Sequence, residues 1–189
     1  MTTYFLQQHY TGITYGRDDL NLKEFEGCVF DKCDFGACNF IGVTFIDCTF
    51  KDCHFTGAKI NHVAFRTVHF ENCLMQDINF AMCDKLIFEM HFYRCVLDFA
   101  KFYTLKIKRI VFTDCSMIAV DFMKADLTEA IFDRCDLYKA VFSNTILEKV
   151  DFRTSVNFAI DPEKNKLKKA TFSAQNVKGL LDKYGIVVV

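Results

Sequence analysis

The chain has 189 residues, a formal net charge of −1 and 51% hydrophobic residues, with 22 Phe and no Trp. These values fit one globular domain with a substantial core, and the balanced charge does not indicate binding to nucleic acid, an anionic membrane or an acidic substrate. There is no signal-peptide pattern and no window of eighteen uncharged apolar residues, so we expect a cytoplasmic protein with reduced thiols and no membrane contact.

Residues 1–19 are expected to form an N-terminal cap. Tyr4, Phe5, Tyr10 and Tyr15 supply large aromatic groups here, but the small residues that accompany such groups later in the chain are missing. Because an open end of stacked β-structure exposes unpaired backbone groups, we expect this segment to cover it.

Residues 20–154 carry a large apolar residue at every fifth position. The series runs from Phe25 to Phe80, slips by two residues, and resumes from Ile87 to Phe152. A period of five matches neither a helix nor a strand, so the chain must turn once in each repeat. A second set of smaller residues lies two positions before the large ones and is also expected to point inward. It includes all ten Cys if the slip falls just after Cys83.

Cysteine sets a longer period. On one phase the spacings are 20, 20, 22, 20 and 20 residues: Cys33, Cys53, Cys73, Cys95, Cys115 and Cys135. One coil therefore has 20 residues in four repeats, and we expect about six to seven coils, stacked at the strand separation of about 4.8 Å, with the slip taken up as a bulge. One wall of this column would consist only of Phe.

Residues 155–189 are expected to leave the column. The polar segment 160–169 contains the only proline and predicts a loop, and Ser173 is a suitable N-cap for a helix over residues 174–184. A strand-prone, uncharged stretch follows. We expect this region to join two copies as a homodimer, with a monomer whose tail folds back as the alternative. The candidate dimerisation residues are Val177, Leu180, Leu181, Tyr184, Ile186, Val187 and Val188.

Few residues suggest chemistry. The cysteines lack the spacing of a zinc site and are expected to be unpaired core residues. His69 and His91 should lie on adjacent coils with outward side chains; they would give a metal two ligands, but a solvated pair is the simpler interpretation. We find no nucleophile paired with a base and no Gly-rich phosphate loop. We therefore expect no catalytic, cofactor or metal site and no small-molecule substrate.

Charge varies along the chain. The net charge is −5 over residues 18–80, +3 over 81–109, −3 over 110–154 and +3 over 155–189. Such alternation is also ordinary for a soluble surface, so by itself it assigns no partner.

Individual repeats resemble a known family. CVFDK from Cys28, CDFGA from Cys33 and ADLTE from Ala125 are similar to the pattern of pentapeptide-repeat proteins, in which a small residue, Asp or Asn, Leu or Phe and two mostly polar residues recur. The resemblance covers about residues 20–154. It implies an all-β solenoid, a right-handed quadrilateral β-helix, here with an N-terminal cap, a short C-terminal helix and a terminal strand.

The resemblance also implies a function. Some members of the family imitate duplex DNA and bind a type II topoisomerase (gyrase), and related gyrase-binding members dimerise tail to tail. It therefore implies a non-enzymatic protein-interaction module, a candidate DNA mimic that does not itself bind nucleic acid. The alternative is a structural or stress-related spacer, since the charge is near zero and the long loops of the quinolone-resistance members are missing. The candidate acidic surface is Asp34, Asp121, Asp126, Asp136 and Asp151.

Overall fold

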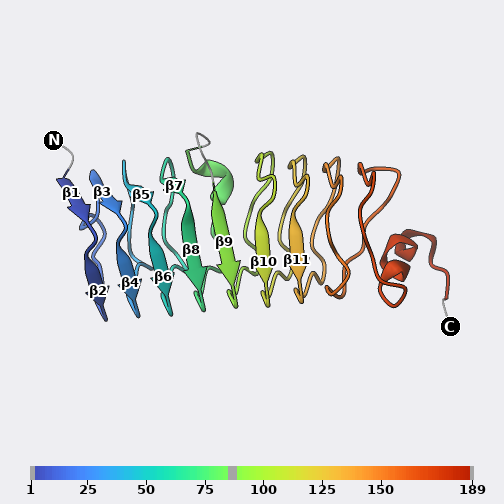
Figure 1. Cartoon of the computed structure of the whole chain (residues 1–189), viewed down its shortest axis with the longest axis horizontal. Coiled ribbons are helices and arrows are strands. Elements are labelled where there is room, and N and C mark those ends of the chain that lie inside the picture. Colours follow the sequence, from blue (N-terminus) through green and yellow to red (C-terminus); the bar gives the residue numbers. More distant parts are fainter. Residues whose placement is uncertain (1–2, 85–88, 188–189) are drawn as a thin grey trace.

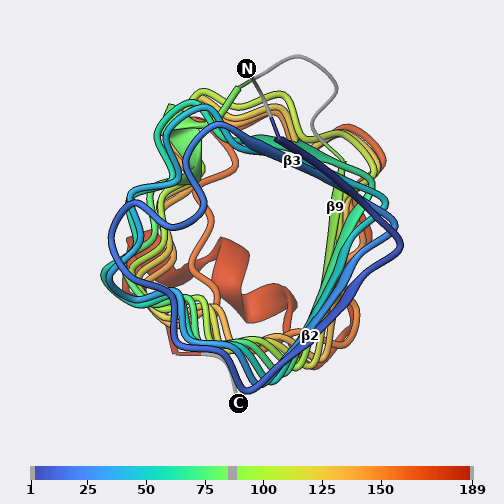
Figure 2. The ribbon, with the colours of Figure 1, turned by 90° about the vertical axis from the view of Figure 1, so that its left-hand side faces the viewer.

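The computed structural model describes residues 3–84 and 89–187. The chain winds into a column of stacked coils with its two ends at opposite ends of the column (Figure 1). Successive coils superpose when viewed along the column (Figure 2). This is the parallel all-β solenoid that the spacing predicted. Ile87, predicted as a large inward residue, and Val188, predicted as a dimerisation residue, lie outside the described residues.

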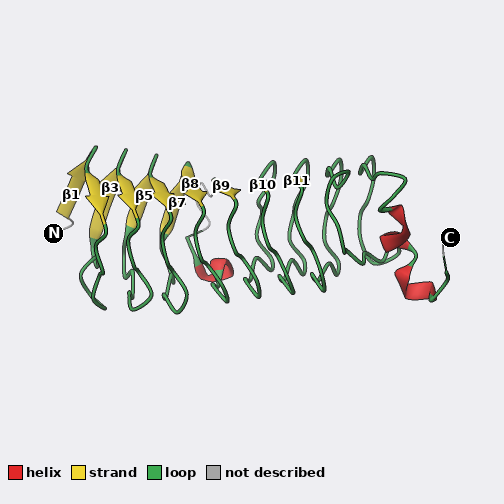
Figure 3. Ribbon diagram, turned by 90° about the horizontal axis from the view of Figure 1, so that it is seen from below, coloured by secondary structure: helices red, strands yellow, loops and turns green. Residues whose placement is uncertain are grey.

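Two parallel sheets occupy two sides of the column. The first contains β1 (Thr3–Leu6), β3 (Lys23–Glu26), β5 (Thr44–Ile46) and β7 (Ala64–Arg66). The second contains β2 (His9–Thr11), β4 (Val29–Asp31), β6 (Thr49–Lys51), β8 (Val68–Glu71), β9 (Met90–Tyr93), β10 (Val111–Thr113) and β11 (Ile131–Asp133). On the remaining sides, coils are joined by single β-bridges, and ribbon arrows are therefore confined to part of the column (Figure 3).

The strand register confirms the twenty-residue coil. Phe30 pairs with Phe50, and Phe50 with Phe70. The two-residue slip falls between β8 and β9, where Phe70 pairs with Phe92, and the short 3-10 helix η1 (Phe80–Met82) precedes it. The coils on either side of the slip therefore stay aligned.

The predicted wall of Phe is present. From Phe30 to Phe152 on the second sheet, neighbouring rings are nearly parallel and their centroids lie 4.9–5.2 Å apart. Rings on opposite sides meet edge to face, as Phe92 and Phe102 do at 86°. Both arrangements suit the charge distribution of aromatic rings, so the core gains directional contacts in addition to buried area.

The smaller inward residues bind the coils together by hydrogen bonds. Cys135 Sγ donates to Phe112 O at 3.4 Å, 23 residues earlier, and Thr145 Oγ1 and Ser155 Oγ donate to the corresponding carbonyls. All ten cysteines are buried and unpaired, as predicted. Burial raises the pKa of the Cys38 and Cys48 thiols to about 12, because an apolar interior disfavours the thiolate.

Most repeats turn at a residue two positions after the central residue, and this residue has a positive φ. Many of these residues are not glycine: φ is 57° at Lys124, 58° at Lys139 and 55° at Asn144. Side chains at these corners project outward, and a positive φ is least favourable for bulky side chains.

The N-terminal segment is itself a coil. Phe5 stacks on Phe25 at 5.1 Å and Tyr10 on Phe30 at 4.9 Å, in register with the column. The aromatic residues expected to cap the column therefore extend it by one turn.

The prediction that residues 160–169 leave the column was wrong. Lys166 bridges to Ile146 and Thr171 to Asp151, and Phe172 stacks on Phe152 at 5.4 Å. Leu167 and Phe172 stand 20 residues after Leu147 and Phe152, so the last coil keeps enough inward residues to continue the stack.

The predicted α-helix over 174–184 is also corrected. The chain forms two 3-10 helices, η2 (Val177–Leu180) and η3 (Asp182–Tyr184). The backbone of this cap packs directly on the last coil: Ile160 N donates to Gly179 O at 3.0 Å, and a Cβ on Gly179 would stand 2.3 Å from Phe158 O.

A 3-10 helix repeats every three residues, so the four residues expected on one α-helical face separate. Leu180 packs against the core, whereas Val177, Leu181 and Tyr184 are exposed. Ile186 and Val187 lie in no strand of the described part of the chain. Among the described residues, no helix is long and apolar enough to cross a membrane.

Candidate interaction surface

The five predicted aspartates lie on different sides of the column. Asp34 and Asp136 lie on one line of β-bridges but are five coils apart, with His54, Leu74, Val96 and Ser116 between them. Asp121 bridges to Lys101, Asp126 to Lys106, and Asp151 to Ile131, on three other lines. The structure therefore does not bring these carboxylates together as one stripe.

These aspartates also have a local role. Asp34 Oδ1 accepts a hydrogen bond from Gly36 N at 2.8 Å, and Asp121 Oδ1 accepts one from Met123 N at 2.8 Å. The bond from Gly36 N lowers the pKa of Asp34. Asx turns of this kind fix the bend that follows each central residue. The Asp in the repeat pattern is thus explained by backbone geometry.

Opposite charges on successive coils offset one another. Lys101 Nζ lies 2.6 Å from Asp77 Oδ1, and Arg134 Nε lies 2.6 Å from Asp114 Oδ1. Further ion pairs of this kind join Lys51 with Glu71 and Lys149 with Glu129. The surface is therefore a patchwork of both signs, and pairs this exposed contribute little to stability.

An apolar surface was missed at the sequence level. We call it the Phe99 flank. It consists of the exposed Leu74, Phe99, Tyr138 and Val156 and the half-buried Val96 and Ile118. Leu74 bridges to Val96, and Phe99 N donates to Ile118 O at 2.8 Å, so its members lie on neighbouring coils.

Phe99 is the most unusual member of this flank. It is 54% exposed, and it is the only Phe among residues 3–84 and 89–187 with an exposed side chain. It occupies a corner with φ of 62°, where the preceding and following coils carry Asp77 and Ala119. The sequence did contain a signal, since Phe99 stands off the five-residue phase on which the other Phe residues from Phe92 to Phe152 lie.

Polar groups within the Phe99 flank are already bonded inside the chain. Asp98 Oδ1 accepts hydrogen bonds from Ser116 Oγ at 2.6 Å and from Ile118 N at 3.0 Å. Asp136 Oδ1 accepts from Tyr138 N and from Asn157 Nδ2. A partner covering this flank would therefore leave few polar groups without hydrogen bonds, and the cost of desolvation would be low.

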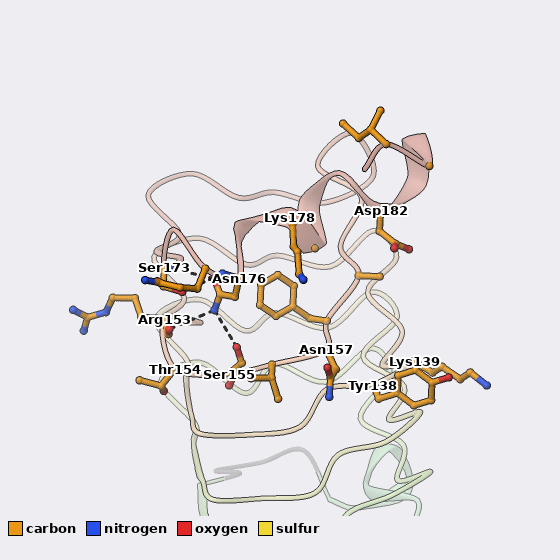
Figure 4. Close-up of a pocket in the computed structure, with 17 residues that line it drawn as sticks. Tyr138, Lys139, Arg153, Thr154, Ser155, Asn157, Ser173, Asn176, Lys178 and Asp182 are labelled. Atoms are coloured by element: carbon orange, nitrogen blue, oxygen red, sulfur yellow. Dashed lines mark hydrogen bonds between the residues drawn. The ribbon is translucent and has the colours of Figure 1, made fainter. Parts of the chain in front are cut away.

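The flank ends at a hollow of about 1110 Å³ between the last coil and the cap. Tyr138 and Val156 from the flank line it, together with Asn176 and Ile186 from the cap, and Lys178 points from η2 toward the coil (Figure 4). Asn176 Nδ2 donates to Phe152 O at 2.7 Å and to Ser155 O at 3.0 Å, which fixes the cap to the coil.

The predicted dimerisation residues lie around this end. Tyr184, Ile186 and Val187 are exposed there, and Val188 lies outside the described residues. Lys183 Nζ, in η3, lies 2.7 Å from Asp161 Oδ1 and 2.8 Å from Glu163 Oε2. These ion pairs fix the cap to the last coil. These bonds lower the pKa values of both carboxyl groups.

The two histidines are adjacent, as predicted. The rings of His69 and His91 stack with centroids 4.9 Å apart and planes at 12°. Burial, with the neighbouring His69, lowers the pKa of His91. In the described part of the chain, no three His, Cys, Asp or Glu side chains gather in a metal-binding arrangement.

Comparison with known proteins extends these observations. A trypsin-treated form of QnrB1, a plasmid-mediated fluoroquinolone resistance protein, is similar with a TM-score of 0.69 and 15% identity over 100% of both chains. Full-length QnrB1 has a TM-score of 0.54 and 17% sequence identity, over 97% of this chain and 100% of the QnrB1 chain. HetL is a pentapeptide repeat protein involved in heterocyst differentiation regulation in the cyanobacterium Nostoc sp. strain PCC 7120. Its TM-score is 0.41 and its sequence identity 13%, over 89% of this chain and 86% of HetL.

At these identities the similarity concerns the fold. None of the curated protein sequences matches the chain. The model of the pentapeptide repeat region, in contrast, matches residues 23–87 and 85–161, which is most of the chain. With the five-residue period, the twenty-residue coil and the stacked core, this match identifies the chain as a member of the pentapeptide-repeat family.

Proposed function

We propose that this protein is a non-enzymatic rod that binds another protein along the Phe99 flank. The exposed Phe99 is the observation that carries the proposal. A bulky apolar side chain at a positive-φ corner makes no contribution to the core, and aromatic residues are enriched where proteins bind one another. The ten unpaired thiols fit the reducing cytoplasm as its place of action.

The flank has the composition expected of the centre of an interface. Phe99 and Tyr138 are rigid aromatic anchors, and the carboxylates between them are already bonded within the chain. A spacer without a partner would require no such surface. The spacer function therefore predicts that substitutions on this flank have no effect on any interaction.

A matched pair of substitutions tests the proposal. Phe99→Lys suits its corner, because Lys139 occupies an equivalent corner with φ of 58°. Ile41→Lys is the control, because Ile41 is 55% exposed but lies on a distant coil. Affinity capture from the native cell should recover a partner with the wild-type protein and with Ile41→Lys, and lose it with Phe99→Lys. Equal recovery with all three proteins would contradict the proposal.

A type II topoisomerase is the partner that the family resemblance favours, by DNA mimicry. The support is the rod-like fold shared with QnrB1 and the net charge of −5 over residues 18–80, where Asp47 and Asp52 are exposed near the two sheets. The five scattered aspartates supply only isolated charges to such a surface. If the rod competes with DNA, it should inhibit supercoiling by gyrase, and added salt should weaken this inhibition.

Asp47→Lys combined with Asp52→Lys distinguishes mimicry from apolar docking. Mimicry predicts that this variant loses the inhibition while Phe99→Lys keeps it. If the wild-type protein leaves supercoiling unchanged, the topoisomerase is excluded as a partner, and the Phe99 flank can still be tested by capture.

We also propose a homodimer joined at the C-terminal caps. Tyr184, Ile186 and Val187 expose apolar surface beside the hollow, and a second copy would cover it. Light scattering should give at least twice the monomer mass for the wild-type protein. It should give a smaller mass for Tyr184→Lys combined with Val187→Lys.

A further inference from the structure

The first coil has an open edge. β1 pairs only with β3, and β2 only with β4, so each is the last strand of its sheet. Thr3 N and Gln7 N donate to the second coil, at Leu22 O and Glu26 O. Backbone groups alternate in direction along a strand, so those of Tyr4 and Leu6 face away from the column. Gln8 Nε2 bonds to Leu6 O at 2.8 Å and covers part of this edge.

This edge carries no protective charge. Residues 3–16 contain no Asp, Glu, Lys or Arg, whereas the equivalent window of the next coil, residues 23–36, contains six. Tyr4 and Leu6 are 50% and 47% exposed. Edge strands are normally kept from pairing with other chains by charged residues, by proline or by a covering element. Residues 3–16 contain no such charge and no proline, and Gln8 covers only part of the edge.

A buried polar group at this end also lacks a partner. Tyr15 stacks on Phe35 at 5.1 Å, and its Oη is buried without a hydrogen bond among the described residues. At the opposite end, Asn176 satisfies the carbonyls of Phe152 and Ser155. The chain therefore completes its C-terminal end with its own side chains and leaves the N-terminal end incomplete.

We propose that the first coil is an interface at which two copies of this chain meet, N-terminal end to N-terminal end. A twofold axis would set the facing edges of β1 and β2 antiparallel, which lets their backbone groups form hydrogen bonds. The partner copy's coil would cover the outer faces of the Phe5, Tyr10 and Tyr15 rings, as the second coil covers their inner faces.

Charge and geometry favour a second copy in this orientation. Because residues 3–16 carry no formal charge, two such edges approach each other without repulsion between like charges. Head-to-tail stacking is blocked, because η2 and η3 cover the last coil (Figure 1). This interface is independent of the Phe99 flank and of the C-terminal dimer.

The test compares substitutions at the two ends of the full chain. Leu6→Lys combined with Thr11→Lys adds charge to the exposed positions of the N-terminal edge, and Tyr184→Lys combined with Val187→Lys does so at the cap. Met123→Lys is the control, an exposed apolar residue in the middle of the column. Sedimentation velocity over a range of concentrations measures association, and circular dichroism checks that each variant is folded.

We expect the wild-type protein and Met123→Lys to associate, and the N-terminal variant to associate at least about tenfold more weakly, which corresponds to about 1.4 kcal/mol. If both ends associate, the wild-type protein forms assemblies larger than a dimer. Only a variant that carries both pairs of substitutions is then monomeric. An N-terminal variant with unchanged association, or a wild-type protein that remains monomeric at all concentrations, would overturn the proposal. A dimer that only the cap substitutions dissociate would assign the contact to the C-terminus instead.

Discussion

Asn176 Nδ2 donates to Phe152 O at 2.7 Å, in the place where Ser155 Oγ, one coil earlier, donates to Phe132 O at 2.8 Å. An amide in the cap thus donates the hydrogen bond that a thiol or a hydroxyl donates in earlier coils. The carbonyl of Phe152 is therefore bonded, although the coil that follows it gives way to the cap after Phe172.

Asn176→Ala should therefore destabilise the C-terminal end. The substitution leaves the carbonyls of Phe152 and Ser155 without their donor, at a cost of about 1–3 kcal/mol for a buried group. Hydrogen exchange should become faster in the last coil and the cap before it does so elsewhere. Gln175→Ala is the control, because it removes an exposed side chain beside Asn176, and we expect no measurable change in exchange.

Phe112→Ala should reduce the stability of the whole column. Phe112 is fully buried between Phe92 and Phe132, both at 5.2 Å, so its removal leaves a cavity that the rigid stack cannot close. We expect a loss of about 3–5 kcal/mol in urea unfolding. Phe172→Ala, at the partly exposed end of the same stack, should cost less. Equal losses would show that the column does not transmit packing from coil to coil.

The thiols should be unreactive in the folded protein. All ten are buried, and burial opposes formation of the thiolate that attacks a disulfide reagent. Titration with an aromatic disulfide at mildly alkaline pH should detect few thiols in native protein and ten after denaturation. A native disulfide, or fast labelling of folded protein, would contradict this arrangement.

The cap should loosen in acid before the column does. Lys183 lowers the pKa values of Asp161 and Glu163, so these pairs stabilise the fold above the ordinary carboxyl range of about pH 4 and lose their effect as the pH falls through the lowered values. Exchange of cap amides should increase in this window. Lys183→Gln should weaken the cap at neutral pH and reduce the pH dependence, and an unchanged profile would exclude the ion pairs as its cause.

The sequence predicts the column well because its inward positions are filled by one kind of residue at one spacing. The register of Phe50 on Phe30 follows from the period alone. The last coil escaped prediction because Asn157 and Pro162 stand where the period requires large apolar residues. The series therefore seemed complete at Phe152, although Leu167 and Phe172 continue it.

The interaction surface was harder to predict, for a physical reason. Asp34 and Asp121 could be read equally as surface charge or as turn residues, and only coordinates show their bonds to Gly36 N and Met123 N. Phe99 stands outside the apolar series, but only the structure shows that its side chain is exposed. The five-residue period identifies the inward residues reliably. Which outward side chains become neighbours depends on how the coils lie against one another, and the period does not give this.

The slip between β8 and β9 has a consequence for how this rod can diversify. The stack of Phe50, Phe70 and Phe92 keeps the same spacing of 5.1 Å across it, so the two extra residues between β8 and β9 do not disturb the core. Chain length between these strands is therefore decoupled from packing inside. Descendants of this gene would be free to lengthen that connection into a recognition loop, and a protein engineer could graft a foreign peptide there without redesigning the interior.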